Sequence, residues 1–338
     1  MPGPPPAVAA VRVAVRRALT GAPLGEHPSP LLLVACSGGA DSLALAAATA
    51  FVAPRLGWRA GATVVDHGLQ EDSAEVAERA ERQCRGLGLD PVEVVRARVE
   101  VTGEGPEADA RRARYAVLAA RAHALGARAV LVGHTRDDQA EQVLLGLARG
   151  SGARSLSGMP PCRPLGEEAP GADGVLLLRP LLGLTRRQTW QACLDLGLEP
   201  WQDPHNDDPR YARVRARRAI SDLQADLGPG LVLGLTRSAE LLRDDAEALD
   251  EAARTAYRQL GDPPWQVGRL LDLPRAVRTR LWRRASLAAG SPGTDLTSEH
   301  LLAVDDLLTR WRGQGPLHLP GGVRASRDGD RVWVGRPS

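Results

Sequence analysis

The sequence predicts an α/β protein in which a largely parallel sheet is covered by helices and followed by a smaller, mainly α-helical domain. Between about residues 30 and 150, short apolar runs alternate with stretches of helical periodicity, as in a parallel sheet. Few polar residues interrupt the apolar runs, which is typical of strands buried on both faces. Beyond about residue 218 the pattern changes to long helices. We therefore expect two domains, 1–217 and 218–338.

An amphipathic helix over Val8–Leu19 precedes the alternating region, and strands and helices then follow in turn. The expected strands are Leu31–Ala35, Ala62–Val65, Val92–Val95 and Ala129–Val132. The helices expected after them are Asp41–Ala50, Ser73–Leu87, Glu107–Leu125 and Asp137–Ala148. Right-handed crossovers bring the carboxyl ends of parallel strands to one edge of a sheet, so the loops after these strands should form the ligand site.

The remaining chain predicts a loop, further helices and a terminal hairpin. Residues 150–175 are rich in glycine and proline and predict a loop or a small insertion. Further helices are expected over Thr185–Leu196, Leu231–Leu260 and Arg275–Ala289. Turn residues separate alternating apolar residues between Pro316 and Val334, so the second domain should end in a β-hairpin.

Composition limits the chemistry that is open to the chain. Its 338 residues carry a net charge of only +2, so any nucleic-acid surface must be a local patch. All 43 basic residues are arginines, which excludes a phosphate-binding loop of the Gly-Lys-Ser/Thr type and a Schiff-base lysine. Phosphate must then be bound by backbone amides, arginine and metal. The 4 cysteines form no Cys-x-x-Cys pair, as in a reduced protein without a zinc site.

No stretch of the sequence predicts a membrane partner. The first residues lack the basic and apolar regions of a signal sequence, and arginines interrupt the apolar pattern of Val8–Leu19. No run approaches the roughly 20 apolar residues that a membrane span requires. We expect a cytoplasmic protein, and the sequence leaves its oligomeric state, including a homodimer, open.

The segment Ser37-Gly38-Gly39-Ala40-Asp41-Ser42 lies between the first expected strand and the helix that follows it. Its glycines let the backbone approach a ligand closely, and the free amides of the helix start point at that ligand. Together they predict an anion site suited to pyrophosphate. An aspartate fits such a site if a cation bridges it to phosphate, so Asp41 is the expected Mg²⁺ ligand. The alternative is an ordinary glycine turn in which Ser37 or Asp41 caps the helix.

Three carboxylates, Asp137, Asp138 and Glu141, lie at the start of the helix after the fourth strand. They could hold a substrate ammonium group or a metal and help to deprotonate an amine; Asp137 and Glu141 share one helix face. The alternative is that they only stabilise the positive end of the helix. His67 and His134 follow two apolar runs and should meet at one sheet edge, either as structural hydrogen-bonding groups or as groups that transfer protons.

The densest basic stretch contains five arginines, and two of them, Arg213 and Arg217, fall on one helix face. The full set is Arg210, Arg213, Arg215, Arg217 and Arg218. Such a stripe binds the phosphates of RNA or ATP by bidentate contacts, or is a solvated helix face in an arginine-rich chain.

The segment Ser37–Ser42 resembles the PP-loop of ATP pyrophosphatases, which adenylate a substrate carbonyl, release pyrophosphate and share the adenine nucleotide α-hydrolase-like fold. Three further stretches resemble the tRNA(Ile)-lysidine synthase family in order and spacing: Val65–Leu69, Gly133–Glu141 and Arg149–Gly152. Other matching residues are Arg111, Arg114, Tyr115, Arg179–Leu182 and Trp201–Asn206. Residues beyond about 220 resemble the helical domain of that family, without the additional domain of its longer members.

The resemblance implies an ATP-dependent ligase that joins free L-lysine to carbon 2 of the wobble cytidine in an isoleucine tRNA with a CAU anticodon. The base would be adenylated first, and ATP and Mg²⁺ are the implied cofactors. The expected ATP-binding residues are Ser37, Gly38, Gly39, Ala40, Asp41, Ser42, Asp66, His67 and His134. The expected catalytic residues are Asp41, Asp137, Asp138 and Glu141. The expected tRNA or lysine contacts are Arg111, Arg114, Arg149, Arg210, Arg213 and Arg217.

Two other functional classes stay open on the residues alone. One is a different PP-loop enzyme that modifies tRNA, such as a thiolase, although sulfur transfer favours paired cysteines or an iron–sulfur cluster, and neither arrangement is present in the sequence. The other is a non-catalytic module that binds ATP or RNA. Such a module would tolerate loss of Asp41 or of the Asp137–Asp138 pair, and all three residues are present.

Overall fold

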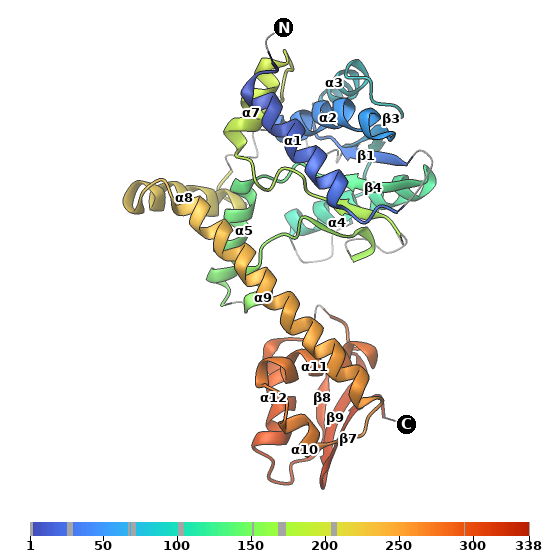
Figure 1. The fold of residues 1–338 in the computed structure, drawn as a ribbon, viewed down its shortest axis with the longest axis vertical. Helices are drawn as coiled ribbons and strands as arrows, with labels where there is room; N and C mark the ends of the chain where they lie inside the picture. The colour runs from blue at the N-terminus through green and yellow to red at the C-terminus, as the bar shows by residue number, and fades with distance from the viewer. Residues whose placement is uncertain are drawn as a thin grey trace. The chain divides into compact units, whose positions relative to one another are not determined.

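The computed structural model describes residues 3–25, 30–66, 68, 72–100, 105–150, 152–167, 174–203, 208–293 and 295–337. It divides into two compact units, Met1–Glu240 and Leu241–Ser338 (Figure 1). The boundary expected from the sequence, 217/218, falls inside α8 (Ala212–Leu227). Because α8 packs against α5 (Arg136–Ala148), the division by packing comes later in the chain. None of the described helices combines the length and the apolar character of a membrane span.

A six-stranded sheet organises the first unit, in the order β3-β2-β1-β4-β6-β5. The four predicted strands are present and parallel: β1 (Leu31–Ala35), β2 (Arg59–Asp66), β3 (Val92–Arg96) and β4 (Ala127–Leu131). β6 (Leu176–Leu178) is parallel to β4, and β5 (Cys162–Pro164) is antiparallel to β6 at the edge of the sheet. The predicted loop over 150–175 therefore contains a strand. Three residues are too few for a periodic signal, and an edge strand accommodates a proline such as Pro164.

Helices cover both faces of this sheet, as predicted. Leu32 and Val34 of β1 belong to one apolar core, and Leu31 and Leu33 belong to another, because alternate side chains of a strand point to opposite faces. The first core includes residues of α1 (Pro6–Gly21), α2 (Ala40–Val52), α3 (Ser73–Gly86) and α7 (Arg186–Asp195). The second core includes residues of α4 (Pro106–Ala124). Short helical turns complete the unit: η1 (Pro54–Leu56), α6 (Ala153–Leu156) and η2 (Leu165–Glu167).

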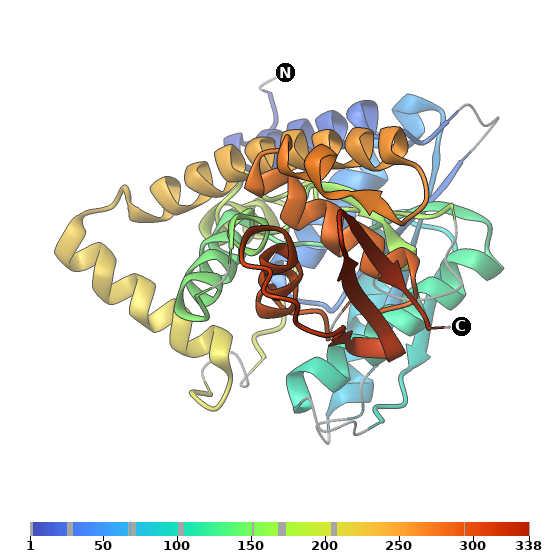
Figure 2. The ribbon, with the colours of Figure 1, turned by 90° about the horizontal axis from the view of Figure 1, so that it is seen from below.

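The second unit combines helices with a small antiparallel sheet, whose order is β7-β10-β9-β8. Its helices are the later part of α9 (Leu231–Leu260), α10 (Val267–Leu271), α11 (Arg275–Ala288) and α12 (Ser298–Thr309). The predicted terminal hairpin consists of β9 (Val323–Asp328) and β10 (Arg331–Gly335), the dark red pair in Figure 2. The sheet is larger than a hairpin because it also contains β7 (Trp265–Gln266) and β8 (Leu317–Leu319), the latter joined to β9 by η4 (Pro320–Gly322).

A buried ion pair joins α11 to α12 in the core of the second unit. Arg278 donates from Nε and Nη2 to Asp305, at 2.8 and 3.0 Å, and Trp282 Nε1 donates to the same carboxylate at 3.1 Å. Asp305 is 3% exposed and Arg278 is 7% exposed. Burial raises the pKa of Asp305, but the hydrogen bonds from Arg278 and Trp282 outweigh it, so the pKa lies below its usual value.

Replacement of Asp305 with asparagine is expected to destabilise the second unit by about 3 kcal/mol, because Arg278 would remain buried without a counter-charge. The stabilisation from Asp305 is complete well above its usual pKa of 3.8 and decreases as the pH falls toward the lower folded-state pKa. Urea unfolding followed by tryptophan fluorescence measures the loss. The half-exposed neighbour Asp306 supplies the control, and an Asp305→Asn variant as stable as Asp306→Asn would contradict the prediction.

Candidate active site

The predicted anion loop, Ser37–Ser42, follows β1 and runs into the first turn of α2. The first hydrogen bond of α2 runs from the Leu43 amide to the Gly39 carbonyl at 3.0 Å, so the amides of residues 40–42 are the open amides of the helix start. Ser42 Oγ donates to the Gly39 carbonyl at 2.9 Å and accepts from the Ser37 amide at 3.1 Å. These contacts close the loop into a tight turn, with Ser37 exposed and Ser42 buried.

Two glycines allow this turn to pack against its surroundings. Gly38 has a φ of +83°, in the left-handed region, and its carbonyl accepts from the Trp201 amide at 2.9 Å. Gly133 follows β4, and a Cβ atom there would lie 2.9 Å from the carbonyl carbon of Asp41 and 3.1 Å from the amide nitrogen of Ser42. The start of α2 therefore packs directly against the backbone of Gly133, where no side chain would fit.

A Gly133→Ala variant is expected to reduce ATP-dependent turnover about tenfold or more, because backbone atoms of α2 would have to move away from the new methyl group. Gly183 is the matched control, since a Cβ atom there meets nothing within 4 Å. Steady-state AMP release by the two variants makes the comparison. Equal turnover of Gly133→Ala and Gly183→Ala would show that the close approach at Gly133 does not constrain the loop.

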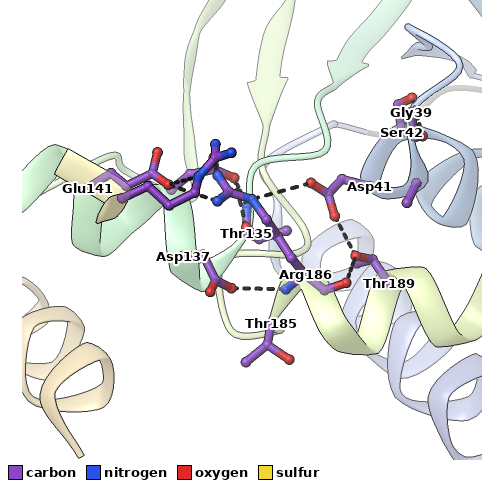
Figure 3. Close-up of polar contacts among 12 residues, drawn as sticks. Gly39, Asp41, Ser42, Thr135, Asp137, Glu141, Thr185, Arg186 and Thr189 are labelled. Carbon is purple, nitrogen blue, oxygen red and sulfur yellow. Dashed lines mark hydrogen bonds and ion pairs between the residues drawn. The ribbon is translucent and has the colours of Figure 1, made fainter. Parts of the chain in front are cut away.

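Asp41 lies in the first turn of α2, with its side chain directed to α7 (Figure 3). Its Oδ1 atom accepts a hydrogen bond from the Thr189 hydroxyl, and its Oδ2 atom lies 4.0 Å from Arg186 Nε. Burial and the nearby charges of Asp138 and Asp137 raise the pKa of Asp41 to about 6, although Thr189 and Arg186 oppose this shift. A carboxylate in such surroundings is suited to bind a cation.

The donor set fits a magnesium ion that is shared with a nucleotide. Within the described ranges, no three His, Cys, Asp or Glu side chains gather as a group that could hold a metal. A cation at Asp41 would therefore complete its coordination with phosphate oxygens and water, which is how Mg²⁺ is usually bound beside a triphosphate.

The two aspartates of α5 have different partners. Asp138 Oδ2 accepts from the amide and the hydroxyl of Thr135, at 2.7 and 2.8 Å, while its Oδ1 accepts from Arg186. Burial raises the pKa of Asp138, but the charge of Arg186 and the hydrogen bonds from Thr135 lower it to about 2, so this side chain is ionised. Asp137 Oδ2 accepts from the backbone amide of Arg186 at 2.9 Å.

Glu141 is buried, at 2% exposed, and lines a cavity of about 110 Å³. Its Oε1 atom accepts from Arg186 Nη1 at 2.8 Å and from Arg217 Nε at 2.9 Å. Its Oε2 atom is buried and has no hydrogen-bond partner in the part of the chain that the structure describes. Such an oxygen costs on the order of 1–3 kcal/mol unless a donor reaches it. The other residues around the cavity are Asp137, Arg186, Arg217, Ile220, Ser221, Gln224 and Val232.

Asp66 ends β2 and His134 follows β4, the two strands on either side of β1, and neither side chain has a hydrogen bond to the predicted anion loop within the described residues. Asp66 Oδ1 accepts from the Gly68 amide at 2.8 Å, so the recorded contact of its side chain is within its own turn. The Nδ1 atom of His134 is buried without a partner among the described residues. Burial and the charges of Arg179, Arg114 and Arg213 lower the pKa of His134 to about 3, so the ring is neutral at physiological pH. His67 lies outside the described residues.

The six predicted arginines do not gather at one place. Arg217 contacts Glu141, whereas Arg111 and Arg114 lie over the ring of Tyr115, at 4.6 and 5.5 Å from its centroid. The charges of Arg114 and Arg213 reach His134.

The remaining two arginines lie on the surface. Arg149 is exposed at the end of α5. Arg210 is also exposed and pairs with Asp208 at 2.7 Å. The roles expected for these two residues stay predictions.

Sequence reasoning missed Arg186 and Thr189, both from the first turn of α7. The start of this helix is recognisable, because the Thr185 amide donates to Gln188 Oε1 at 2.9 Å, and Gln188 donates back to the Thr185 hydroxyl at 3.3 Å. The direction of that turn toward the carboxylates depends on the packing of α7 against α1 and α2. No local pattern contains this information.

Two family models match the chain. Residues 14–224 match a PP-loop domain, and residues 266–333 match the TilS substrate binding domain. The U34-tRNA thiolase NcsA of Methanococcus maripaludis, solved with its [4Fe-4S] cluster, has a similar fold: the TM-score is 0.55 at 18% identity, over 70% of this chain and 80% of that one. At this identity the likeness concerns the fold alone.

Much closer relatives are tRNA(Ile)-lysidine synthases. The chain is 54% identical to the one from Thermobifida fusca, over 99% of both chains. It is 52% identical to the one from Salinispora tropica, over 97% of this chain and 96% of that one. It is 50% identical to the one from Streptomyces coelicolor, over 98% of this chain and 99% of that one. With these identities over nearly its whole length, the chain belongs to the tRNA(Ile)-lysidine synthase family.

Proposed function

We propose that this protein joins the side-chain amine of free L-lysine to carbon 2 of the wobble cytidine in an isoleucine tRNA with a CAU anticodon, at the expense of ATP. The observation that carries the proposal is that two features meet at the first turn of α7. The predicted anion loop contacts this turn through Asp41 and Thr189, and a cavity lined by Arg186 and Glu141 adjoins it. Such a pair suits a phosphate ester and an amine that must meet.

The first step would be adenylation of the base. The carbonyl oxygen at carbon 2 of cytosine attacks the α-phosphorus of ATP, the bond to the β-phosphate breaks, and pyrophosphate leaves. The open amides of residues 40–42 are suited to hold the phosphates, because a helix start favours negative charge. Asp41 would hold a Mg²⁺ ion that neutralises phosphate charge. The chain itself then contributes mainly position and electrostatic stabilisation.

The second step would be attack of the lysine ε-amine on carbon 2. The new C–N bond forms, the amine loses a proton, and AMP leaves with the former carbonyl oxygen. We assign the cavity beside Glu141 to lysine, since Ile220 and Val232 offer apolar contacts to a methylene chain. Glu141 Oε2 would accept from an ammonium group of the amino acid. Lysine would thus satisfy the acceptor that the described chain leaves open.

The tRNA would contact both units of the protein. Arg111, Arg114 and Arg213 are candidates for phosphate contacts near the reaction site, because arginine binds phosphate in a bidentate manner. The second unit matches the TilS substrate binding domain, and we assign to it a share of tRNA binding. Since the substrate is tRNA, we infer a cytoplasmic site of action.

The decisive experiment incubates the protein with ATP, Mg²⁺, labelled lysine and transcripts of two tRNAs. The expected result is label on the isoleucine tRNA with a CAU anticodon, together with AMP release that depends on lysine. A methionine tRNA with the same anticodon should stay unlabelled. Label on neither tRNA, in a preparation that binds ATP, would count against the proposed reaction and in favour of a binding module.

A further inference from the structure

One residue outside the predicted set, Arg186, contacts all four predicted catalytic carboxylates. Its amide donates to Asp137 at 2.9 Å, its Nη2 donates to Asp138, and its Nη1 donates to Glu141 at 2.8 Å (Figure 3). Its Nε lies 4.0 Å from Asp41 Oδ2. The guanidinium therefore hydrogen-bonds Glu141 and Asp138 of α5 and lies at ion-pair distance from Asp41 of α2, while the amide of Arg186 holds Asp137.

The surrounding structure fixes Arg186 in this position. Just before it, the Leu184 carbonyl accepts from the Arg136 amide at 2.8 Å, which attaches the start of α7 to the start of α5. On the other side, Thr189 donates its hydroxyl to Asp41, and Cys193 Sγ donates to the Ala40 carbonyl at 3.3 Å, which attaches α7 to α2. The side chain of Arg186 is mostly buried, at 27% exposed.

The contacts of Arg186 are unequal. Its hydrogen bonds are to the α5 carboxylates, whereas the distance to Asp41 exceeds hydrogen-bond length. Arg186 Nη1 and Arg217 Nε both donate to Glu141 Oε1. With that oxygen occupied, Oε2 is the Glu141 oxygen that has no hydrogen-bond partner among the described residues; this atom is buried, and Glu141 lines the cavity. Asp138 and Glu141 both hydrogen-bond the Arg186 guanidinium, and its positive charge offsets the repulsion between the two carboxylates.

We propose that Arg186 is a positioning residue for the amine half of the reaction, because it holds Asp138 and Glu141 in the arrangement that presents Glu141 Oε2 to the incoming lysine. This inference rests on the proposed function and extends it: the first turn of α7 sets the geometry of the lysine step, while adenylation depends on the α2 loop and Asp41. Arg186 acts through Glu141 and need not touch the reacting atoms.

The test separates the two half-reactions in variants of the full chain. Adenylation is measured without lysine, as transfer of label from [α-³²P]ATP to the tRNA; the lysine step is measured as lysine-dependent release of that label. Arg186→Gln is expected to lower kcat/KM for lysine about 100-fold, mainly through KM, because the charge-assisted hydrogen bonds to Glu141 and to Asp138 are lost. Adenylation should change less than about threefold.

Further variants distinguish positioning from a general structural role. Arg186→Lys keeps the charge but not the two-pronged geometry, so it should recover part of the lysine step. Arg187→Gln, at the exposed neighbouring position, should behave as the unmodified protein. In the double variant Glu141→Gln with Arg186→Gln, the loss should be close to that of Glu141→Gln alone, since the two residues act as one unit.

Three outcomes would overturn the inference. They are an Arg186→Gln variant that matches Arg187→Gln, equal losses in both half-reactions, and additive losses in the double variant. If Arg186→Gln does not fold, as judged by thermal unfolding, then the comparison of Arg186→Lys with Arg187→Gln decides, and selective loss of the lysine step in Arg186→Lys is required. Failure of the unmodified protein to adenylate tRNA would instead refute the proposed function itself.

Discussion

Replacement of Asp41 with asparagine is expected to slow adenylation of the tRNA on the order of 10²–10³-fold, a loss typical of removing one group that stabilises developing charge. Asparagine keeps the shape of the side chain and an oxygen that can accept from Thr189, so the start of α2 should be preserved. The variant loses the negative charge that would hold a cation against the phosphates. The measurement is label transfer from [α-³²P]ATP to tRNA over a range of Mg²⁺ concentrations.

Asp195 provides the control for this variant, because it lies exposed at the end of α7 and accepts a hydrogen bond from Gln191 of the same helix. Asp195→Asn should adenylate at the normal rate. ATP binding by Asp41→Asn, followed by equilibrium titration, tests whether the loop still forms. Normal adenylation by Asp41→Asn, with an unchanged dependence on Mg²⁺, would place the metal elsewhere and refute the assignment of Asp41.

The second large effect is expected at Glu141. Glutamine at this position keeps the volume but removes the charge that Arg186 and Arg217 both contact, and truncation of such buried charge pairs costs about 2–5 kcal/mol. We therefore expect kcat/KM for lysine to fall by roughly two to three orders of magnitude. Adenylation of the tRNA should persist, so the adenylated intermediate should accumulate.

The accumulated intermediate gives this prediction its readout. After incubation with [α-³²P]ATP, the Glu141→Gln protein should carry labelled tRNA that lysine releases slowly, and the exposed replacement Glu78→Gln should release it at the normal rate. If the Glu141→Gln protein released the label as fast as Glu78→Gln, the assignment of the cavity beside α5 to lysine would be wrong. Retained adenylation serves as the evidence that the variant is folded.

The sequence predicts the framework of the first unit well, because long apolar runs and helical periods are local signals. β1 to β4 and the helices between them are present as expected. The short strands β5, β7 and β8 are not predictable in this way, since two or three residues cannot show a period. Their formation depends on neighbouring strands that supply hydrogen bonds, which is a property of the folded chain.

In the candidate site, too, the residues with a local sequence signal are predictable, whereas those that depend on contacts in the folded chain are not. Ser37–Ser42 is a local signal, because its glycines and its position before a helix are visible in the sequence, and the structure places it between β1 and α2. Arg186 has no such signal, since its importance comes from carboxylates that lie 45 or more positions away in the chain. For the arginines a local signal is present but misleading. Their closeness in the sequence predicts a common role, whereas in the structure Arg217 contacts Glu141 and Arg210 contacts Asp208.

The most direct test of the account asks which molecule becomes attached to AMP. The protein is mixed with [α-³²P]ATP and the isoleucine tRNA in the absence of lysine, and the tRNA is digested to locate the label. Label is expected on the wobble cytidine alone, and it should be released quantitatively as AMP once lysine is added. Unlabelled tRNA, combined with exchange of pyrophosphate into ATP that requires lysine but no tRNA, would show that the amino acid is activated and would contradict the account.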